Sequence, residues 1–395
     1  MFRDFSLSAA YTGLLASFVG YSASFAIVLA GLTAVGASEQ QAATGLFFGA
    51  MGMGVCSVII PALTRTPSAM AWSTPGAAFL ASTALLPGGF AEAVGAFIVT
   101  AFMIIITGLI PALGRLVSNI PKPVANALLA GVLLKLCFAP ALALGAVPLL
   151  VLPVLIAWLI GLSISKLAAM PLALLALIGV LVFGVDLSGV LSGGEDAAAL
   201  LPAFDFVRPM FTLSSVISVA LPLYLVTMAG QNIPGFAVLE LNNFPVRRQP
   251  LLRQTGLASA IIAPFGAVPV NMSAITAAMM CGEEAHTDPR RRYWAGIVSG
   301  FGYITFAFAA GLIARVAAVA PPELITAIAG LALMPALVAA FTRAFEDSKQ
   351  LEAPALTFLI AASGMTLFGV SGAFWGLVVG AVVWITKRAS AGRKA

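Results

Sequence analysis

Long apolar stretches that could cross a membrane make up most of this chain, and helix-breaking polar motifs interrupt some of them. A backbone that leaves helical hydrogen bonding is costly at bilayer depth unless protein surrounds it or it lines a cavity. Interrupted spans at matching places in two halves of a chain therefore predict a buried binding site. The interruptions lie at Arg65–Gly76, Gln231–Gly235 and Gly266–Ser273, and a weaker one lies at Gly20–Ser22.

Composition excludes a soluble fold. The chain is 61% hydrophobic and 9% charged, whereas a soluble domain carries about 25% charged residues. The cysteines Cys56, Cys137 and Cys281 lie in apolar runs, without the spacing of a metal or redox motif. We therefore expect an all-α polytopic membrane protein that holds no metal and no cofactor.

Apolar length predicts fourteen membrane spans. A span needs about 20 apolar residues, and fewer where it is broken or re-entrant. The third and the tenth are expected to be short helices preceded by extended stretches. The predicted spans cover residues 8–35, 41–60, 67–86, 91–113, 121–139, 144–162, 168–190, 212–240, 249–266, 268–281, 291–315, 321–342, 353–369 and 371–386.

Basic residues predict the orientation of these spans. With both termini in the cytoplasm, the Lys and Arg residues gather in cytoplasmic loops; only Arg208 and Arg315 fall outside, and Lys135 falls within a span. This distribution follows the positive-inside rule. The net charge of +5 is thereby explained by topology, and we expect no nucleic-acid partner.

The two halves of the chain are similar to each other. The loop at residues 191–211 separates seven predicted spans from seven more, so the second half enters the membrane from the opposite side. Pro123–Gly131 and Pro322–Gly330 share the same Pro-to-Gly spacing, at an offset of 199 residues (322 − 123). These features predict an inverted repeat of seven plus seven spans.

The same offset matches Trp72 with Asn271 and Thr74 with Ser273. We expect the two short helices that follow to converge near the midplane with their N-termini facing each other. Such ends carry unpaired amides and the positive end of the helix dipole, and they bind anions without Lys or Arg. The side chains of Ser73, Thr74, Asn271 and Ser273 are then candidate ligand donors. The alternative is that they only cap their own helices.

A third motif places Gln231 and Asn232 near the middle of the eighth span. Neighbouring helical residues point about 100° apart, so we expect Gln231 to face a ligand and Asn232 to brace the first span. The alternative is that both amides only hold neighbouring helices together. The other candidates form an apolar wall with one hydroxyl beside the anion end: Tyr21, Ser22, Phe25, Trp72 and Met272.

Four strings of residues resemble the bacterial benzoate/proton symporter family, and the resemblance runs the full length of the chain. They are Met228–Leu239, Arg65–Pro67, Ile120–Val124 and Gly266–Thr276. That family is similar in architecture to the uracil and nucleobase transporters and to the sulfate-type anion exchangers. The resemblance implies a bacterial inner-membrane transporter that takes up benzoate or a related aromatic carboxylate together with protons.

The resemblance also implies two domains that move against each other as an elevator, often within a homodimer. The substrate would bind between spans 3 and 10, walled by spans 1 and 8. The core would contain spans 1–4 and 8–11, at residues 1–117 and 206–320. The gate would contain spans 5–7 and 12–14, at residues 118–205 and 321–395.

One departure from the nucleobase transporters concerns acidic residues. Those proteins carry carboxylates in spans 8 and 10, whereas this chain has Gln231 in the first and Asn271 and Ser273 in the second. Its Asp and Glu residues fall in predicted loops or near span ends, which favours an anionic substrate over a neutral base. The proton carrier is left open among Glu240, Glu283, Glu284, His286 and the substrate itself.

Other functions stay open at this point. The missing carboxylates make an anion channel or exchanger on the same fold the main alternative, and a nucleobase/proton symporter is a second. An enzyme is disfavoured because His286 is the single histidine and the sequence holds no Ser/His/Asp or metal-ligand grouping. A structural or receptor role lacks a sizeable soluble domain. Lys135 is expected to extend its ammonium outward, without an assigned role in binding.

Overall fold

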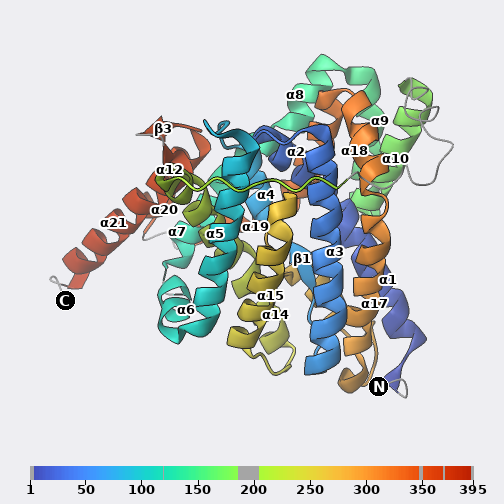
Figure 1. Cartoon of the computed structure of the whole chain (residues 1–395), viewed down its shortest axis with the longest axis horizontal. Helices are drawn as coiled ribbons and strands as arrows, with labels where there is room; N and C mark the ends of the chain where they lie inside the picture. Colours follow the sequence, from blue (N-terminus) through green and yellow to red (C-terminus); the bar gives the residue numbers. More distant parts are fainter. Residues whose placement is uncertain (1–3, 119, 186–203, 347–349, 368–369, 393–395) are drawn as a thin grey trace.

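The computed structural model is a bundle of helices with two short strand pairs (Figure 1). It describes residues 4–118, 120–185, 204–346, 350–367 and 370–392. Most of the predicted central loop at residues 191–211 therefore lies outside the described residues.

The elements of the first half, in chain order, are α1 Leu7–Ser22, α2 Phe25–Ala34, α3 Glu39–Thr64, β1 Met70–Trp72, α4 Thr74–Ala81, α5 Gly89–Leu109, α6 Pro111–Ser118, α7 Lys122–Cys137, α8 Ala139–Ala146, α9 Pro148–Ile164 and α10 Ala169–Gly184. Those of the second half are α12 Leu213–Ser215, η3 Val216–Ala220, α13 Leu221–Thr227, η4 Met228–Asn232, α14 Ile233–Leu241, α15 Arg248–Ile262, η5 Ala263–Phe265, β2 Val270–Met272, α16 Ala274–Cys281, η6 Pro289–Arg291, α17 Tyr293–Ala307, α18 Ala310–Val319, α19 Pro322–Ala344, α20 Glu352–Ala362, β3 Thr366–Leu367, β4 Val370–Ser371 and α21 Gly372–Gly392.

Each predicted span contains at least one helix, but the count of fourteen spans is not established. Among the described residues, six helices are long and apolar enough to cross a membrane. A seventh span results if α17 and α18, which bend by 52°, are counted as one. Pro148–Ile164, Ala169–Gly184, Glu352–Ala362 and Gly372–Lys387 are apolar helices shorter than 18 residues. The short helices α6 and α8 were not expected from the sequence.

The expected extended stretches are present as β1 and β2, which pair antiparallel with Ala71 opposite Asn271. Two further bonds continue the pairing: the Ser73 amide donates to the Pro269 carbonyl and the Ser273 amide to the Ala69 carbonyl, each at 2.9 Å. Both strands lead directly into helices of eight residues, α4 and α16. The strands begin at residues 70 and 270. Their offset is therefore 200 (270 − 70), one residue more than the offset of 199 expected from the Pro-to-Gly spacing.

The eighth predicted span is not broken at Gln231–Gly235, and this expectation was wrong. Helical structure runs from Leu213 to Leu241 without a gap, because two π-helical turns, η3 and η4, lie within it. In η4 the amide of Ile233 donates to the carbonyl of Met228, five residues earlier. Pro234 follows directly, in the first turn of α14. A π-helical turn absorbs a local irregularity that would otherwise end the helix, and such turns are frequent at functional sites.

The first span is interrupted, as its motif predicted. Helix α1 ends at Ser22 and α2 begins at Phe25. The side chain of Ser24 donates to the carbonyl of Gly20 at 2.6 Å. The turn between the two helices places aromatic residues beside the strand pair.

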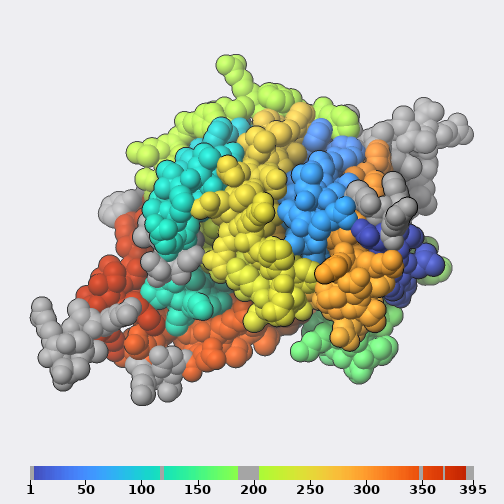
Figure 2. Space-filling view, turned by 90° about the horizontal axis from the view of Figure 1, so that it is seen from below, coloured from blue at the N-terminus to red at the C-terminus, as the bar shows by residue number. Residues whose placement is uncertain are grey.

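The helices around the strand pair pack closely. Helix α3 lies along α17, and glycines let them approach closely: a Cβ on Gly300 would lie 2.7 Å from the Gly54 carbonyl oxygen. Helix α15 packs between α3 and α5, and Figure 2 shows the yellow α14–α15 segment between these two neighbours. Helix α7 packs against α19 and α20, and also contacts α4.

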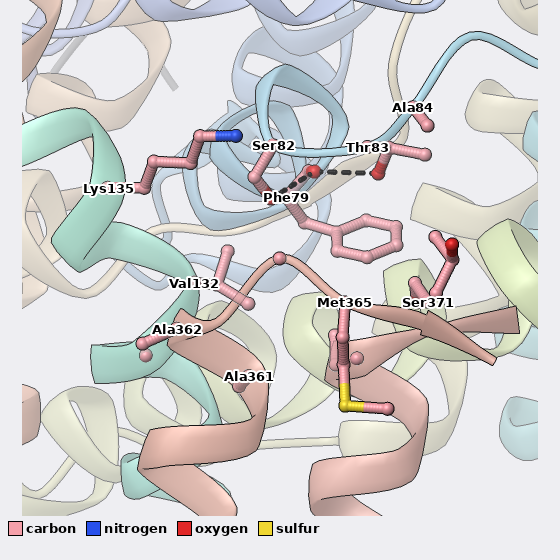
Figure 3. Close-up of a pocket in the computed structure, with 15 residues that line it drawn as sticks. Phe79, Ser82, Thr83, Ala84, Val132, Lys135, Ala361, Ala362, Met365 and Ser371 are labelled. Atoms are coloured by element: carbon pink, nitrogen blue, oxygen red, sulfur yellow. Dashed lines mark hydrogen bonds between the residues drawn. The ribbon is translucent and has the colours of Figure 1, made fainter.

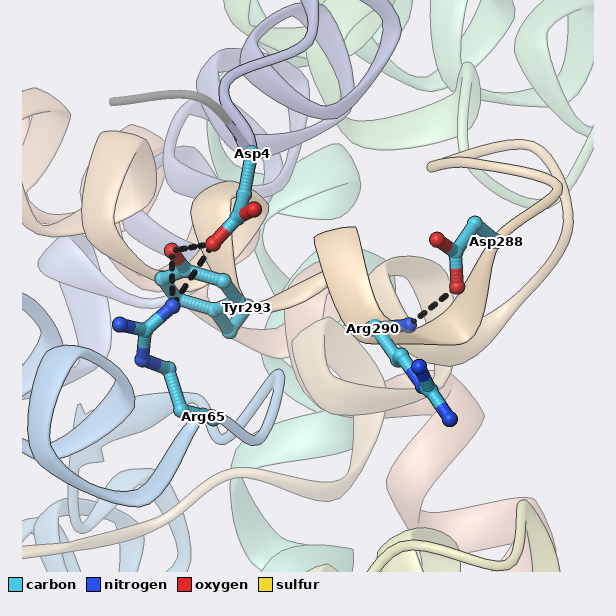
Figure 4. A network of polar contacts seen from close by, with 5 residues as sticks. All are labelled: Asp4, Arg65, Asp288, Arg290 and Tyr293. Atoms are coloured by element: carbon cyan, nitrogen blue, oxygen red, sulfur yellow. Dashed lines mark hydrogen bonds and ion pairs between the residues drawn. The ribbon is translucent and has the colours of Figure 1, made fainter. Parts of the chain in front are cut away.

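A polar cluster holds the beginning of the chain to this bundle. Arg65, which follows α3 with a left-handed φ of 56°, contacts Asp4 at 2.7 Å and the Tyr293 hydroxyl at 2.8 Å (Figure 4). The Tyr293 hydroxyl donates to Asp4 at 2.9 Å. The hydrogen bond from Tyr293, together with the Arg65 guanidinium, lowers the pKa of Asp4 below its ordinary value.

Candidate functional site

The two short helices begin side by side, at the strand pair, deep in the protein. Ser73 and Asn271 are fully buried and Ser273 is 6% exposed. Because β1 and β2 are antiparallel, α4 and α16 leave the pair in opposite directions with their N-termini adjacent. Each N-terminus carries unpaired amides unless another group accepts from them. The partners of those amides decide which end can receive a ligand.

The N-terminus of α4 is largely closed. The Ser73 side chain accepts from the Gly76 amide at 3.1 Å, and its hydroxyl also lies 2.6 Å from that of Thr227. The Ala77 amide donates to the Ser73 carbonyl at 2.7 Å. Pro75 has no amide hydrogen to offer. Only the amide and hydroxyl of the half-buried Thr74 are left without a partner within the described part of the chain.

The N-terminus of α16 is open. The Ser273 side chain does not cap the helix; it accepts from the Thr276 hydroxyl at 2.7 Å, so its own proton is free to donate. The amides of Ala274, Ile275 and Thr276 have no acceptor among the described residues. Three amides, one hydroxyl proton and the positive end of the dipole therefore face the same place. This arrangement can hold an anion.

The two asparagines position β2. Asn232 accepts from the Met272 amide at 3.0 Å, so it braces this strand. The sequence had predicted that it would brace the first span. The Asn271 amide group, in the orientation that satisfies both of its ends, accepts from the Ser73 amide at 3.0 Å and donates to the Met272 carbonyl at 2.7 Å. Both side chains therefore bind backbone groups of the strand pair, which fixes the start of α16.

Gln231 lies in the π-helical turn η4 and is half-buried. Its amide makes no hydrogen bond to any described residue, so both its acceptor and its donors are available. Glycines on either side bring this helix against both half-helices. A Cβ on Gly230 would lie 3.1 Å from Cγ of Pro75, and one on Gly235 would lie 2.6 Å from Cβ of Met272. Gln231 is thus positioned between the beginnings of α4 and α16.

Aromatic rings gather around Tyr21, at the end of α1. Its ring centroid lies 5.2 Å from that of Trp72, 6.0 Å from that of Phe25 and 5.0 Å from that of Phe306. The Trp72 indole donates to the Ser24 hydroxyl at 2.7 Å, which fixes its ring. The Ser22 hydroxyl instead donates to the carbonyl of Val19 in its own helix, at 3.3 Å. Of the residues predicted for the apolar wall, Tyr21, Phe25 and Trp72 thus lie together, and Met272 is fully buried.

Two buried tyrosine hydroxyls stay unsatisfied in the described structure, those of Tyr21 and Tyr303. Tyr303 was not predicted. Its hydroxyl lies close to Gly20 and Thr276, since a Cβ on Gly20 would be 2.4 Å from it and 3.0 Å from Cγ2 of Thr276. An unpaired buried polar group is unfavourable unless it has a partner at some stage of the function. A lone tyrosine in an apolar helix gives no sequence signal for this role.

The proposed proton carriers lie away from this site. Glu240 pairs with Arg248 at 2.7 Å on an exposed surface, and Glu283 is exposed. Glu92, at the start of α5, is the one acidic side chain that is buried among the described residues. It accepts from the Gly88 amide at 2.8 Å and from the Thr212 hydroxyl, so it holds together the beginnings of two helices.

The described residues hold no group of three or more His, Cys, Asp or Glu side chains that could bind a metal ion. Cys56, Cys137 and Cys281 are all buried as free thiols. The site consists of backbone amides, neutral polar side chains and aromatic rings.

The chain is similar to known membrane proteins over most of its length. The chain is 34% identical to the inner membrane protein YdcO of Escherichia coli over 373 residues, 94% of each chain. It is 31% identical to the benzoate membrane transport protein of Acinetobacter baylyi over 386 residues, 97% of this chain and 95% of that protein. Among solved structures, the transmembrane domain of the cyanobacterial bicarbonate transporter BicA shares the fold, with a TM-score of 0.59 and 16% identity over 96% of this chain and 98% of that one. The family model of the benzoate membrane transport protein matches residues 3–386, and the chain therefore belongs to that family of membrane transporters.

Proposed function

We propose that this protein is a secondary active transporter that takes up benzoate or a related aromatic carboxylate across the bacterial inner membrane by proton symport. The observation that carries the proposal is the open N-terminus of α16, buried beside a cluster of aromatic rings. An anion with a flat apolar body matches both parts of this site. Membership of the benzoate membrane transport family supports the same substrate class.

The carboxylate would accept hydrogen bonds from the amides of Ala274, Ile275 and Thr276 and from the hydroxyl of Ser273. Hydrogen bonds from neutral donors to an ionised group contribute about 1.5–3 kcal/mol each. The dipole of α16 adds a favourable field without a formal cation. A buried Lys or Arg would bind the anion more tightly and slow its release, so a site made of dipoles suits a transporter.

The aromatic body of the substrate would pack against Tyr21, Trp72 and Phe306. Ring pairs with centroids about 4.5–7 Å apart prefer tilted or offset arrangements, and each contributes about 0.5–1.5 kcal/mol beyond the area it buries. Gln231 would donate to the carboxylate or to a ring substituent from the opposite side. The hydroxyls of Tyr21 and Tyr303 would find acceptors when the substrate enters.

We further propose that transport proceeds by an elevator-like movement of a core against a gate within a homodimer, with both termini in the cytoplasm. The core would contain α1–α6 and α12–α18, and the gate α7–α10 and α19–α21. The strand pair supports this division, because β1 and β2 join the two halves of the core through backbone hydrogen bonds and would move with it as one unit.

Uptake into liposomes tests the transport function directly. Purified protein should take up radiolabelled benzoate faster when an inward proton gradient is imposed, and an ionophore that collapses the gradient should remove the acceleration. An uptake rate that does not depend on the proton gradient would argue against symport and would indicate facilitated transport of benzoate instead. Replacing Glu240 or Glu283 by Gln should abolish the acceleration if that residue carries the proton; if neither variant does so, Glu284, His286 and the substrate itself are the carriers left to test.

An anion channel or exchanger is the second candidate, favoured by the absence of carboxylates at the described site. Such a protein would pass chloride across a planar bilayer without benzoate. Large chloride currents would support this reading, and their absence together with saturable benzoate uptake would support the first. A nucleobase symporter is a third reading, and a thermal-shift screen of benzoate against uracil separates it.

A further inference from the structure

A second place in the molecule carries a positive charge without an assigned function. A small surface cleft, with a volume of about 30 Å³, lies at the C-terminal end of α4. Helix α7, the turn after α20 and the beginning of α21 form its other walls. The cleft therefore lies along the boundary between the proposed core, represented by α4, and the proposed gate.

Lys135 lines this cleft (Figure 3). Its side chain extends from α7 toward Ser82 at the end of α4. A Cβ on Gly364, which has a left-handed φ of 66°, would lie 4.0 Å from Nζ of Lys135, so the ammonium lies close to that turn. Lys135 forms no ion pair or hydrogen bond with any described residue, and no Asp or Glu lines the cleft. Its charge is thus uncompensated within this part of the chain.

A purely structural role for Lys135 would be to bind the last carbonyls of α4, where a cation is favoured by the helix dipole. The carbonyls of Ala78, Phe79 and Leu80 already have donors. The hydroxyls of Ser82 and Thr83 each donate to the Phe79 carbonyl at 2.8 Å, and the Ser82 and Thr83 amides donate to the Ala78 and Leu80 carbonyls at 3.2 and 3.0 Å. The three ammonium hydrogens of Lys135 are therefore left for a ligand or for water.

The position of the cleft relates it to the buried site. Helix α4 has eight residues, so its ends lie about 12 Å apart at 1.5 Å per residue. Its N-terminus is at the strand pair and its C-terminus is at Lys135. Under the proposed orientation, Lys122 begins α7 at the cytoplasmic side, and Lys135 lies near the opposite, outer end of the same helix.

We propose that Lys135 forms an outer capture site for the carboxylate, which the anion occupies before it passes along α4 to the buried site. The inference rests on the proposed function, since it assigns a second step to the same substrate. A lone cation in a cleft without acidic residues raises the local concentration of anions and the rate at which they enter. Because Lys135 is exposed, this attraction weakens as salt screens it.

The test measures benzoate uptake into proteoliposomes as a function of external benzoate and salt. Lys135→Gln should raise KM about three- to tenfold at low ionic strength, with the maximal rate changed less than twofold, and should remove most of the salt dependence of KM. Lys135→Arg should stay close to the wild type. The matched control is Lys122→Gln, at the other end of α7, which should leave KM for external benzoate unchanged.

Chemical rescue of a Lys135→Cys variant tests from which side of the membrane the positive charge at this position is reached. Lys135→Cys should behave as Lys135→Gln, and treatment with a membrane-impermeant reagent that attaches a trimethylammonium group should restore a low KM from the outside only. A neutral reagent of similar size should not restore it. The wild-type protein, treated in the same way, controls for its native thiols, which are buried.

The outcomes separate the two proposals. If the wild type takes up no benzoate, the proposed function is wrong. If the wild type transports but Lys135→Gln has an unchanged KM and salt dependence, or the cationic reagent restores uptake only from the inside, the outer capture site is overturned while the transport function stands.

Discussion

The N-termini of α4 and α16 are built from the same sequence of elements, but their backbone amides are capped in α4 and uncapped in α16. Each follows a three-residue strand, each has a serine before its first turn, and each helix has eight residues. In α4 the serine caps its own helix and a proline removes one amide. In α16 the serine leaves the helix uncapped and Ile275 takes the place of Pro75, 200 residues later. Of these two similar helix beginnings, only that of α16 therefore leaves its first amides without partners among the described residues.

The difference shows that partners, not residue type, determine the role of a cap residue. Ser73 is held in place because the Thr227 hydroxyl lies 2.6 Å away and the Gly76 amide donates to it at 3.1 Å. Ser273 instead accepts from Thr276, one turn further along its own helix. The following predictions test this contrast.

Removing an amide from the open end should have the largest effect. Ile275→Pro would give α16 the amide pattern of α4, and proline is tolerated in a first helical turn. Binding of benzoate should weaken by about 1.5–3 kcal/mol, the value of a hydrogen bond to a charged group. Titration calorimetry measures the change. Ile275 is 63% exposed, so Ile275→Ala should bind normally, and equal loss in both variants would contradict the role of the amide.

Replacing each of the two serines by alanine should affect a different property, affinity for Ser273 and stability for Ser73. Ser273→Ala should weaken benzoate binding by about 1–3 kcal/mol with little change in stability. Ser73→Ala should lower stability by about 1 kcal/mol, because a helix cap is lost, and leave affinity nearly unchanged. Affinity and thermal unfolding, measured in the same detergent, check the pair. If Ser73→Ala loses as much affinity as Ser273→Ala, both ends bind the anion.

Replacing the two neighbouring side-chain amides of the π-helical turn, Gln231 and Asn232, should have different effects. Gln231→Ala should weaken binding by about 1 kcal/mol, since its side chain has no other described partner. Asn232→Ala should lower stability instead, because the buried Met272 amide would lose its acceptor. Asn232→Asp offers a matched control that keeps an acceptor. A normal affinity for Gln231→Ala would assign Gln231 a packing role alone.

The smallest effect is expected far from both helix ends, at Asp4. Its pKa is lowered in the folded protein by the hydrogen bond from Tyr293 and by Arg65, so its stabilising contribution is present above the ordinary value of 3.8 and is lost as the pH falls through the lower folded value. Asp4→Asn should therefore slightly lower the unfolding temperature at pH 7, and the difference should vanish in strong acid. A difference that persists there would show that charge is not the cause.

Much of the site could be predicted because its signals are local. Proline and glycine at Arg65–Gly76 and Gly266–Ser273 break helices wherever they occur, so two extended stretches followed by short helices were expected and are present. The aromatic neighbours of Tyr21 followed from the same motifs, since Trp72 enters through β1 and Phe25 through the turn in the first span.

The rest depends on contacts that a single sequence does not display. Asn232 braces β2 because Gly235 lets its helix approach Met272, a relationship across 40 residues. Tyr303 reaches the site because Gly20 leaves room for its hydroxyl. The motif that suggested a break at Gln231 instead forms a π-helical turn. Proline and glycine indicate that a helix is weakened, but they do not indicate whether the chain responds with a break or with a π-helical turn.

That turn has a geometric consequence for the helix that contains it. Thr227, which contacts Ser73, and Gly235, which contacts Met272, are eight positions apart. In a regular α-helix, steps of about 100° would leave them about 80° apart around the axis. The π-helical turn takes up one extra residue, so seven effective steps bring them to within about 20°. The π-helical turn thus takes in one extra residue while Thr227 and Gly235 stay on one face of the helix, next to Ser73 and Met272; the same eight positions in a regular α-helix would turn one of these two contacts away.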